Sequence, residues 1–367
     1  MQSQKLSFDL ELEGLKGKKV LLIGGAGFIG HNLALSLKKN DVDVSIVDGL
    51  QVNNLLSFHH INNTLLGKSL YLKIIDERLS LLRDNDIPLY VEDARDYGRL
   101  SKLINSLQPE VIVLLAAVSH ASRSNKDPLN TFDHSFRTLE NALDCSRHHN
   151  VKHFIYFSSS MVYGNFESDS VNEESPCNPL GIYGALKYGA EKLVIAYNQV
   201  FGLNYTIIRP SALYGERCVS RRVGQIFIEN ALRGSNLSIM GDGIEKLDFT
   251  YIGDLVQGVC RIISNPSSFN QIFNLTYGEG RSILDMAHLV RDHFSSIDIK
   301  NVKRDALVPE RGTLDVTKAK TLIGYVPENP LEIGYIKYIN WYKSLAYSSP
   351  ELFESNINSF NDSQLNE

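Results

Sequence analysis

The stretch that decides the fold is Val20-Leu21-Leu22-Ile23-Gly24-Gly25-Ala26-Gly27-Phe28-Ile29-Gly30. Four apolar residues followed by spaced glycines predict a buried strand, a tight turn and the start of a helix. Gly24 permits the sharp turn after the strand, and Gly27, which has no Cβ, would let a phosphate group approach the backbone closely. Gly30 is expected to let the helix pack tightly on the strand. Free N–H groups and the helix dipole then form an anion site. We expect a dinucleotide pyrophosphate here, contacted by Gly24, Gly27, Phe28, Ile29 and Gly30; an ordinary glycine-rich turn is the alternative.

A second apolar strand, 42–47, ends at Asp48. Dinucleotide folds place a carboxylate on the adenosine ribose at about this distance from the glycines. A carboxylate repels a 2′-phosphate, so Asp48 favours NAD over NADP, although aspartate is also common in turns. Three further candidates for cofactor contacts follow later strands: Asp93 for the adenine amino group, or else a turn acid facing solvent, and the small residues Ala116 and Ala117.

Strands and helices alternate from 18 to 209, which predicts an α/β fold with a Rossmann-type, doubly wound parallel sheet. We expect an N-terminal extension at 1–17 and a dinucleotide-binding domain at 18–209. A smaller C-terminal α/β lobe at 210–345 would bind substrate, with a segment at about 248–275 returning to the first domain. Residues 346–367 are polar and are expected to be disordered. A long insertion at 50–86 contains a helix at 69–82, interpreted as packing.

The composition excludes several classes of protein. The net charge of −5 gives no basic surface for nucleic acid. The longest apolar run, 111–118, is too short to cross a membrane, and the N-terminus lacks the apolar core of a secretion signal. The four cysteines are widely separated, which favours reduced thiols in a cytoplasmic protein over disulfides or metal ligands. We therefore expect a cytoplasmic protein without a metal site.

The second decisive feature is Tyr183-Gly184-Ala185-Leu186-Lys187. Positions four apart share a helix face, so the Lys187 ammonium is expected to favour the Tyr183 phenolate and make it a usable acid or base near neutral pH. This spacing also occurs by chance on helices. Its context strengthens the interpretation, because the preceding strand ends in three serines, of which Ser159 could hydrogen-bond a substrate hydroxyl or carbonyl.

Taken in order, these motifs resemble those of the extended short-chain dehydrogenases/reductases, specifically the NAD-dependent nucleotide-sugar epimerases and dehydratases. The resemblance covers roughly 18–345 and rests on the glycine motif, Asp48, Ser158–Gly164, Tyr183 with Lys187, and Arg209–Gly215. It implies that Tyr183 exchanges a proton with the sugar 4-hydroxyl while hydride moves to and from NAD. It further implies that Lys187 holds the cofactor ribose and lowers the pKa of Tyr183, that Ser159 is the catalytic serine, and that Pro210 contacts the cofactor.

The two residues after Ser159 divide this family. Dehydrating members carry Asp-Glu there as acid and base, whereas this chain has Ser160-Met161. In decarboxylating members, too, the family pattern has glutamate at the second of these positions, where this chain has Met161. The sequence therefore favours a 4-epimerase of a nucleotide sugar, with UDP-hexose or UDP-N-acetylhexosamine as the expected substrate. A 4-keto-sugar reductase or an isomerase remains open, and a non-catalytic dinucleotide sensor would be expected to lack Tyr183 and Lys187.

Substrate contacts are expected at Ser160 and at three arginines, Arg221, Arg222 and Arg311, which could bind a pyrophosphate bidentately. Surface positions are the alternative for these arginines. The chain departs from the family pattern at Ser135, where a helix asparagine is common. The resemblance also implies a homodimer, formed through the helices at 128–149 and 183–201.

Overall fold

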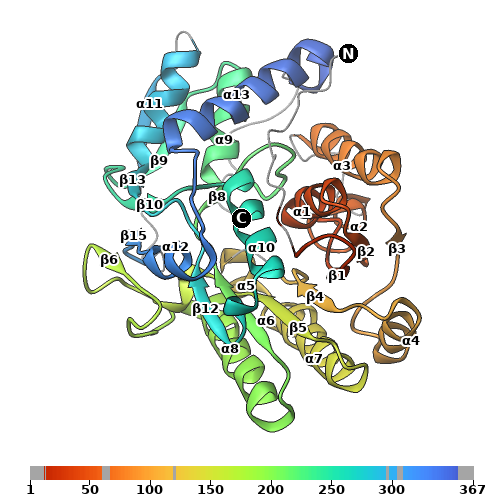
Figure 1. Cartoon of the computed structure of the whole chain (residues 1–367). Coiled ribbons are helices and arrows are strands. Elements are labelled where there is room, and N and C mark those ends of the chain that lie inside the picture. Colours follow the sequence, from red (N-terminus) through yellow and green to blue (C-terminus); the bar gives the residue numbers. More distant parts are fainter. Residues whose placement is uncertain are drawn as a thin grey trace.

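The computed structural model describes residues 12, 14–59, 67–118, 121–294, 297–303 and 309–353. Its centre is a parallel sheet of seven strands in the order β12-β7-β5-β4-β1-β2-β3 (Figure 1). The strands are β1 (Lys19–Ile23), β2 (Asp43–Val47), β3 (Leu89–Tyr90), β4 (Val111–Leu114), β5 (His153–Phe157), β7 (Tyr205–Arg209) and β12 (Gln271–Asn274). The order reverses between β1 and β4, the position at which such sheets bind ligands beyond the carboxyl ends of their strands.

Alternation along the strands builds a core on each face of the sheet. Val20 and Leu22 of β1 point into one core, whereas Leu21 and Ile23 point into the other. Helices α1 (Phe28–Lys39), α3 (Lys68–Asp84) and α10 (Ile252–Ser264) contribute to the first core. Helices α4 (Tyr97–Leu107), α7 (Thr138–His148) and α8 (Gly181–Phe201) contribute to the second. The predicted doubly wound α/β fold is therefore confirmed.

The second half of the chain, together with β6 from the first half, builds a smaller lobe from short paired strands. The pairs are β8 (Leu213–Tyr214) with β11 (Thr250–Tyr251), β10 (Lys246–Asp248) with β13 (Gly280–Ser282), β9 (Leu237–Met240) with β14 (Ile299–Val302), and β6 (Ser170–Val171) with β15 (Thr313–Leu314). Its helices are α9 (Val223–Leu232), α11 (Ile283–His293), α12 (Thr317–Ile323) and α13 (Leu331–Ser348). Between β11 and β13 the chain returns to the first domain: α10 packs on α1, and β12 pairs with β7.

Two expectations about helix boundaries need correction. The expected tail from 346 starts too early, because α13 runs to Ser348, a 3₁₀ turn covers Pro350–Leu352 and Phe353 is buried in the core. Residues 354–367 lie outside the described residues. The helix expected at 128–149 is divided into α6 (Pro128–Phe132), a π-helical turn at Asp133–Arg137, and α7. Wider turns of this kind often occur at functional sites.

Two short helices complete the described structure: α2 (Leu55–His59) after β2 and α5 (Ala121–Lys126) after β4. Helix α5 packs along α8. No helix in the described ranges combines the length and the apolarity needed to cross a membrane.

Candidate active site

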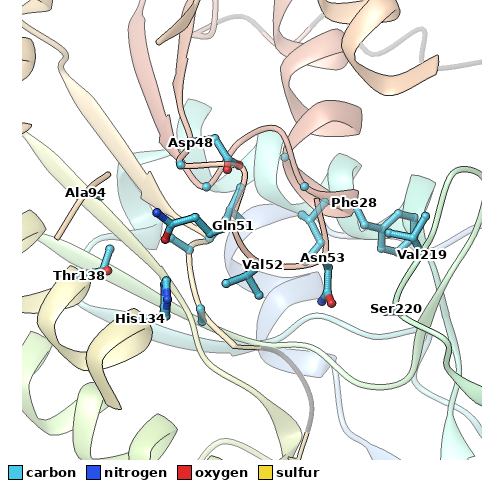
Figure 2. A pocket seen from close by; sticks show the side chains of 18 of the residues that line it. Phe28, Asp48, Gln51, Val52, Asn53, Ala94, His134, Thr138, Val219 and Ser220 are labelled. Carbon is cyan, nitrogen blue, oxygen red and sulfur yellow. The ribbon is translucent and has the colours of Figure 1, made fainter. Parts of the chain in front are cut away.

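A cavity lies at the carboxyl ends of β1, β2 and β4, where the order of the strands reverses. Of the predicted site residues, Gly24, Gly27, Phe28, Ile29, Gly30, Asp48, Asp93, Ala116, Ala117 and Arg222 line it. Figure 2 shows this cavity from close by, with Gln51 between Asp48 and His134 in that view and with Phe28 and Val219 at the opposite end.

The glycine turn has the backbone geometry that an anion site requires. Gly24 has φ +80°, and a Cβ there would lie 2.5 Å from the backbone nitrogen of Ala116. A Cβ on Gly30 would lie 2.4 Å from Gly25, so the helix packs on the turn itself rather than on the strand. A Cβ on Gly27 would meet only Gly24 O, at 3.4 Å. Because α1 has neither a side-chain cap nor an acidic residue in its first turn, its N-terminal N–H groups remain suited to an anion.

Asp48, directly after β2, is held in place by two backbone N–H groups. Its carboxylate accepts hydrogen bonds from the N–H groups of Ala26 at 3.0 Å and Leu50 at 2.7 Å. Burial raises the pKa of Asp48, and these two hydrogen bonds act in the opposite direction. The carboxylate thus lies beside the glycine turn, as expected for a group that contacts the adenosine ribose.

Asp93 belongs to a small polar cluster at the edge of the cavity. It forms an ion pair of 2.6 Å with Arg95 and accepts a hydrogen bond from Gln51 Nε2 at 3.1 Å. The hydrogen bond from Arg95 lowers the pKa of Asp93 to about 2. Asp93 is therefore a charged acceptor at the predicted adenine end, and its contact with adenine remains a prediction.

The π-helical turn contributes a residue that the sequence did not indicate. His134 and Thr138 line the cavity, whereas Ser135 accepts a hydrogen bond from Val118 N at 3.3 Å. Burial lowers the pKa of His134, and the positive charge of Arg95 adds to this effect. Ser135, which replaces a common helix asparagine, thus supports the backbone while His134 faces the cavity.

The catalytic candidates gather beside the cavity, at the carboxyl ends of β5 and β7. Ser159 is buried and accepts a hydrogen bond from Met161 N at 3.2 Å. Lys187 Nζ donates to the carbonyl of Phe157 at 2.6 Å and lies 6.0 Å from the centre of the Tyr183 ring. Because β4 and β5 are neighbours, the ends that carry Ala116 and Ser159 meet at one edge of the sheet. The structure therefore brings Ser159, Tyr183 and Lys187 together.

The pKa of Tyr183 depends on groups beyond its own helix. Burial raises the pKa of Tyr183, and the groups that oppose this shift are the Arg222 guanidinium and a hydrogen bond with Ser159. Burial also lowers the pKa of Lys187 to about 8, although the Glu191 carboxylate counteracts it. The Lys187 ammonium donates to the Phe157 carbonyl, and its effect on the pKa of Tyr183 stays a prediction.

A buried ion pair supports this group from below. Glu191, one helical turn after Lys187, accepts hydrogen bonds from Arg209 at 2.7 and 2.9 Å and from Ser158 Oγ at 2.5 Å. Arg209 also donates to the hydroxyl of Tyr163 at 3.0 Å. Both side chains of the ion pair are almost fully buried. This network holds the end of β5, the end of β7 and α8 in one arrangement.

The remaining predicted residues lie outside the cavity lining. Ser160 is buried and its N–H donates to Pro210 O at 2.9 Å, which joins the segment after β5 to the segment after β7. Arg221 has φ +51°, and its N–H donates to Gln225 Oε1. Arg311 lies in the loop before β15. Among the three arginines, only Arg222 lines the cavity.

Several lining residues were missed by the sequence reasoning. They come from the end of β2 and the loop after it, from the insertion, from the segments after β3 and β4, from the π-helical turn and α7, and from the lobe: Val47, Gly49, Gln51, Val52, Asn53, Arg78, Ala94, Leu115, His134, Thr138, Leu213, Val219 and Ser220. The loop 49–53 could have been included because it directly follows Asp48. Of the lobe residues, Leu213 lies within the Arg209–Gly215 motif, and Val219 and Ser220 follow it.

An uncapped helix start after spaced glycines, a carboxylate after the second strand, and a Ser-Tyr-Lys group beside them define a dinucleotide-dependent enzyme of the short-chain dehydrogenase/reductase type. In the described ranges, no group of three or more His, Cys, Asp or Glu residues could hold a metal ion. The chain belongs to the NAD dependent epimerase/dehydratase family, whose model matches residues 20–276. Its cofactor is NAD, as the sequence predicted.

The relatives include more than one reaction type. A putative UDP-glucose 4-epimerase from Methanocaldococcus jannaschii is 30% identical and covers 89% of this chain and 98% of its own length. A dTDP-glucose 4,6-dehydratase from Streptomyces antibioticus is 25% identical, with coverages of 88% and 92%. The crystal structure of a UDP-glucuronic acid 4-epimerase from Bacillus cereus, in complex with UDP-glucuronic acid and NAD, superposes with a TM-score of 0.78 at 26% identity, covering 89% and 99%.

Proposed function

We propose that this chain is an NAD-dependent 4-epimerase of a nucleotide sugar, with a UDP-hexose or UDP-N-acetylhexosamine as substrate. The observation that carries the proposal is the grouping of Ser159, Tyr183 and Lys187 beside the cavity, with Met161 in the following 3₁₀ turn (Ser160–Val162). Ser160 and Met161 carry no carboxyl group for the acid and base steps of dehydration. The 4-epimerases among the relatives add weight to this choice.

The residues divide the work as follows. The glycine turn would hold the cofactor pyrophosphate, Asp48 the adenosine ribose, and Lys187 the ribose beside the nicotinamide. When bound, NAD would supply a hydride acceptor and donor for sugar C4. Tyr183 Oη takes the proton of the 4-hydroxyl and later gives it back. Ser159 hydrogen-bonds the same oxygen, and Arg222 favours the phenolate that the proton transfer requires.

The test is direct. Purified protein is incubated with UDP-glucose, UDP-galactose, UDP-glucuronic acid and the two UDP-N-acetylhexosamines, and inversion at C4 is followed by NMR. We expect turnover of at least one pair, and Tyr183→Phe should abolish turnover with NAD still bound. The absence of C4 inversion with every sugar, or full activity of Tyr183→Phe, contradicts the proposal. Net oxidation of NADH would instead indicate a 4-keto-sugar reductase.

We also infer that two copies pair through α6, α7 and α8. Helices α6 and α8 carry large exposed apolar side chains: Leu129 (81% exposed), Val200 (70%), Phe201 (49%) and Phe132 (47%). Such a surface is typical of an interface. Light scattering after size exclusion should give a dimer mass. The double change Leu129→Asp and Val200→Asp should give a monomer; an unchanged mass contradicts this interface.

A further inference from the structure

An arginine occupies a core position in the insertion between β2 and β3. Arg78 lies on the same face of α3 as Tyr71, Ile74, Ile75 and Leu82, and it is fully buried. The helical spacing of this segment had indicated apolar packing alone. A buried guanidinium is costly unless it is paired, because it cannot lose its proton.

The hydrogen bonds of Arg78 leave part of its guanidinium without a partner. Nε donates to the carbonyl of Arg217 at 2.8 Å, and Nη2 donates to the same oxygen. Nη1 is buried and has no hydrogen-bond partner among the described residues. In that part of the chain, Arg78 also forms no ion pair with a carboxylate. Leaving a charged donor unsatisfied is more expensive than leaving a neutral one, so an external acceptor is expected.

The position of Arg78 identifies where that acceptor would lie. Its side chain lines the cavity together with Gly24, Gly27 and Gly30, at the start of α1. These glycines supply backbone N–H groups and a helix dipole for an anion, but no side-chain charge. Among the residues that line the cavity, the arginines are Arg78 and Arg222, and only Arg78 comes from the first half of the chain.

Arg78 lies near a second arginine, a neutral histidine and two carboxylates, and neither carboxylate forms an ion pair with it. Arg217 is adjacent, and its Nε donates to His31 Nε2 at 3.1 Å, while His31 Nδ1 lies 2.9 Å from Gly27 O. These partners assign the neutral tautomer with the proton on Nδ1. Burial keeps the pKa of His31 well below its ordinary value, with Arg217 and Arg78 adding to the effect. Arg217 has Glu77 as its carboxylate, at 3.2 Å, whereas Asp48 is held by backbone N–H groups.

We propose that Arg78 binds the pyrophosphate of the dinucleotide cofactor through Nη1, so that the insertion helix α3 forms part of the cofactor site. The Arg217 carbonyl holds one edge of the guanidinium and thereby orients it. The pyrophosphate supplies the missing acceptor, and its negative charge strengthens the hydrogen bond. A second possible anion, a 2′-phosphate on the adenosine ribose, is opposed by Asp48.

The experiment compares Arg78→Met and Arg78→Lys with the wild type. Binding of NAD, ADP and adenosine is measured by calorimetry on protein freed of NAD, with adenosine followed by competition. On loaded protein, replacement of bound NAD by isotopically labelled NAD is followed by mass spectrometry. Neither measurement depends on turnover, so its outcome is independent of whether the enzyme is an epimerase.

We expect Arg78→Met to bind NAD and ADP roughly 10- to 100-fold more weakly, as for loss of a hydrogen bond between charged groups, with adenosine changed less than about twofold. Arg78→Lys keeps the charge and should show a smaller loss with the same selectivity for ADP over adenosine. If Arg78→Met does not fold, the lysine variant alone decides. Arg261→Met is the matched control, because Arg261 also has a buried N–H without a partner among the described residues but does not line the cavity.

Three results would overturn the proposal. Affinities for NAD and ADP equal to those of the wild type would show that the pyrophosphate does not need Arg78. Equal losses for ADP and adenosine would show that Arg78 only shapes the cavity. A loss confined to NADP would place the guanidinium at the ribose 2′ position instead.

Discussion

Replacing Glu191 by glutamine should destabilise the protein strongly. The side chain accepts two hydrogen bonds from Arg209 and one from Ser158, and both members of the ion pair are almost fully buried. Glutamine keeps the shape but removes the negative charge, which leaves the Arg209 guanidinium buried without a counter-charge. Removing one partner of such a pair typically costs about 3–5 kcal/mol.

The expected change in melting temperature follows from the size of the chain. An unfolding entropy of roughly 2.1 cal/mol/K per residue gives about 0.8 kcal/mol/K for 367 residues. A loss of about 3–5 kcal/mol then lowers Tm by about 4–6 °C. Because the Glu191 carboxylate counteracts the effect of burial on Lys187, its removal should also move the pKa of Lys187 further below about 8.

Differential scanning calorimetry measures the first effect, and Glu110→Gln provides the control. Glu110 pairs with Lys152 at 2.6 Å, but the lysine side chain is 71% exposed. Exposed pairs contribute about 0–1 kcal/mol, so this variant should melt within about 1 °C of the wild type. If Glu191→Gln also melts within about 1 °C of the wild type, the buried pair does not hold the ends of β5 and β7 as described.

Three further outcomes test the cofactor site. Gly27→Ala should leave Tm nearly unchanged and abolish NAD binding. Gly30→Ala should abolish NAD binding and also lower the stability of the protein by about 1–3 kcal/mol, because its Cβ would lie 2.4 Å from Gly25. Calorimetry and the NAD content of the purified protein measure the two effects, and equal behaviour of the two variants would contradict this account of the two glycines. Asp48→Asn should raise affinity for NADP relative to NAD by roughly tenfold or more, since like charges placed together cost several kcal/mol; an unchanged ratio of the two dissociation constants contradicts the ribose role. In NMR of ¹⁵N-lysine protein, the Lys187 ammonium should titrate near pH 8. Between about pH 8 and 10.5 the unfolded chain then holds more protons at this lysine than the folded chain, so the free energy of unfolding should rise with pH through that window. A titration midpoint above 10 would refute the burial argument.

The sheet and the glycine turn were predictable because their causes are local. Buried parallel strands are continuous apolar runs, and the turn after Ile23 needs glycine for reasons that the sequence itself displays. The order of the motifs then identified the family. The same local reasoning brought Asp48 and Ala116 to the cavity, since residues that directly follow neighbouring parallel strands meet at one edge.

The parts that were missed depend on distant partners. Arg78 is stable in the core only because the carbonyl of Arg217, 139 residues later, accepts its hydrogen bonds. His134 faces the cavity because a π-helical turn shifts the positions that follow α6, which helical spacing alone does not reveal. Burial raises the pKa of Tyr183 and Arg222 opposes the shift, and Arg222 is a residue of the lobe that the helical spacing around Tyr183 does not reveal.

The return of the chain to its first domain sets an order for folding during synthesis. Strand β12 closes the edge of the sheet beside β7, and α10 covers α1, yet both come after the first strands of the lobe. Until residue 274 has left the ribosome, the growing chain exposes the open edge of β7 and the apolar side of α1. We therefore expect the cofactor-binding half to reach its stable form only after the first strands of the lobe and β12 have been synthesised, and a fragment ending at Arg209 to aggregate rather than fold.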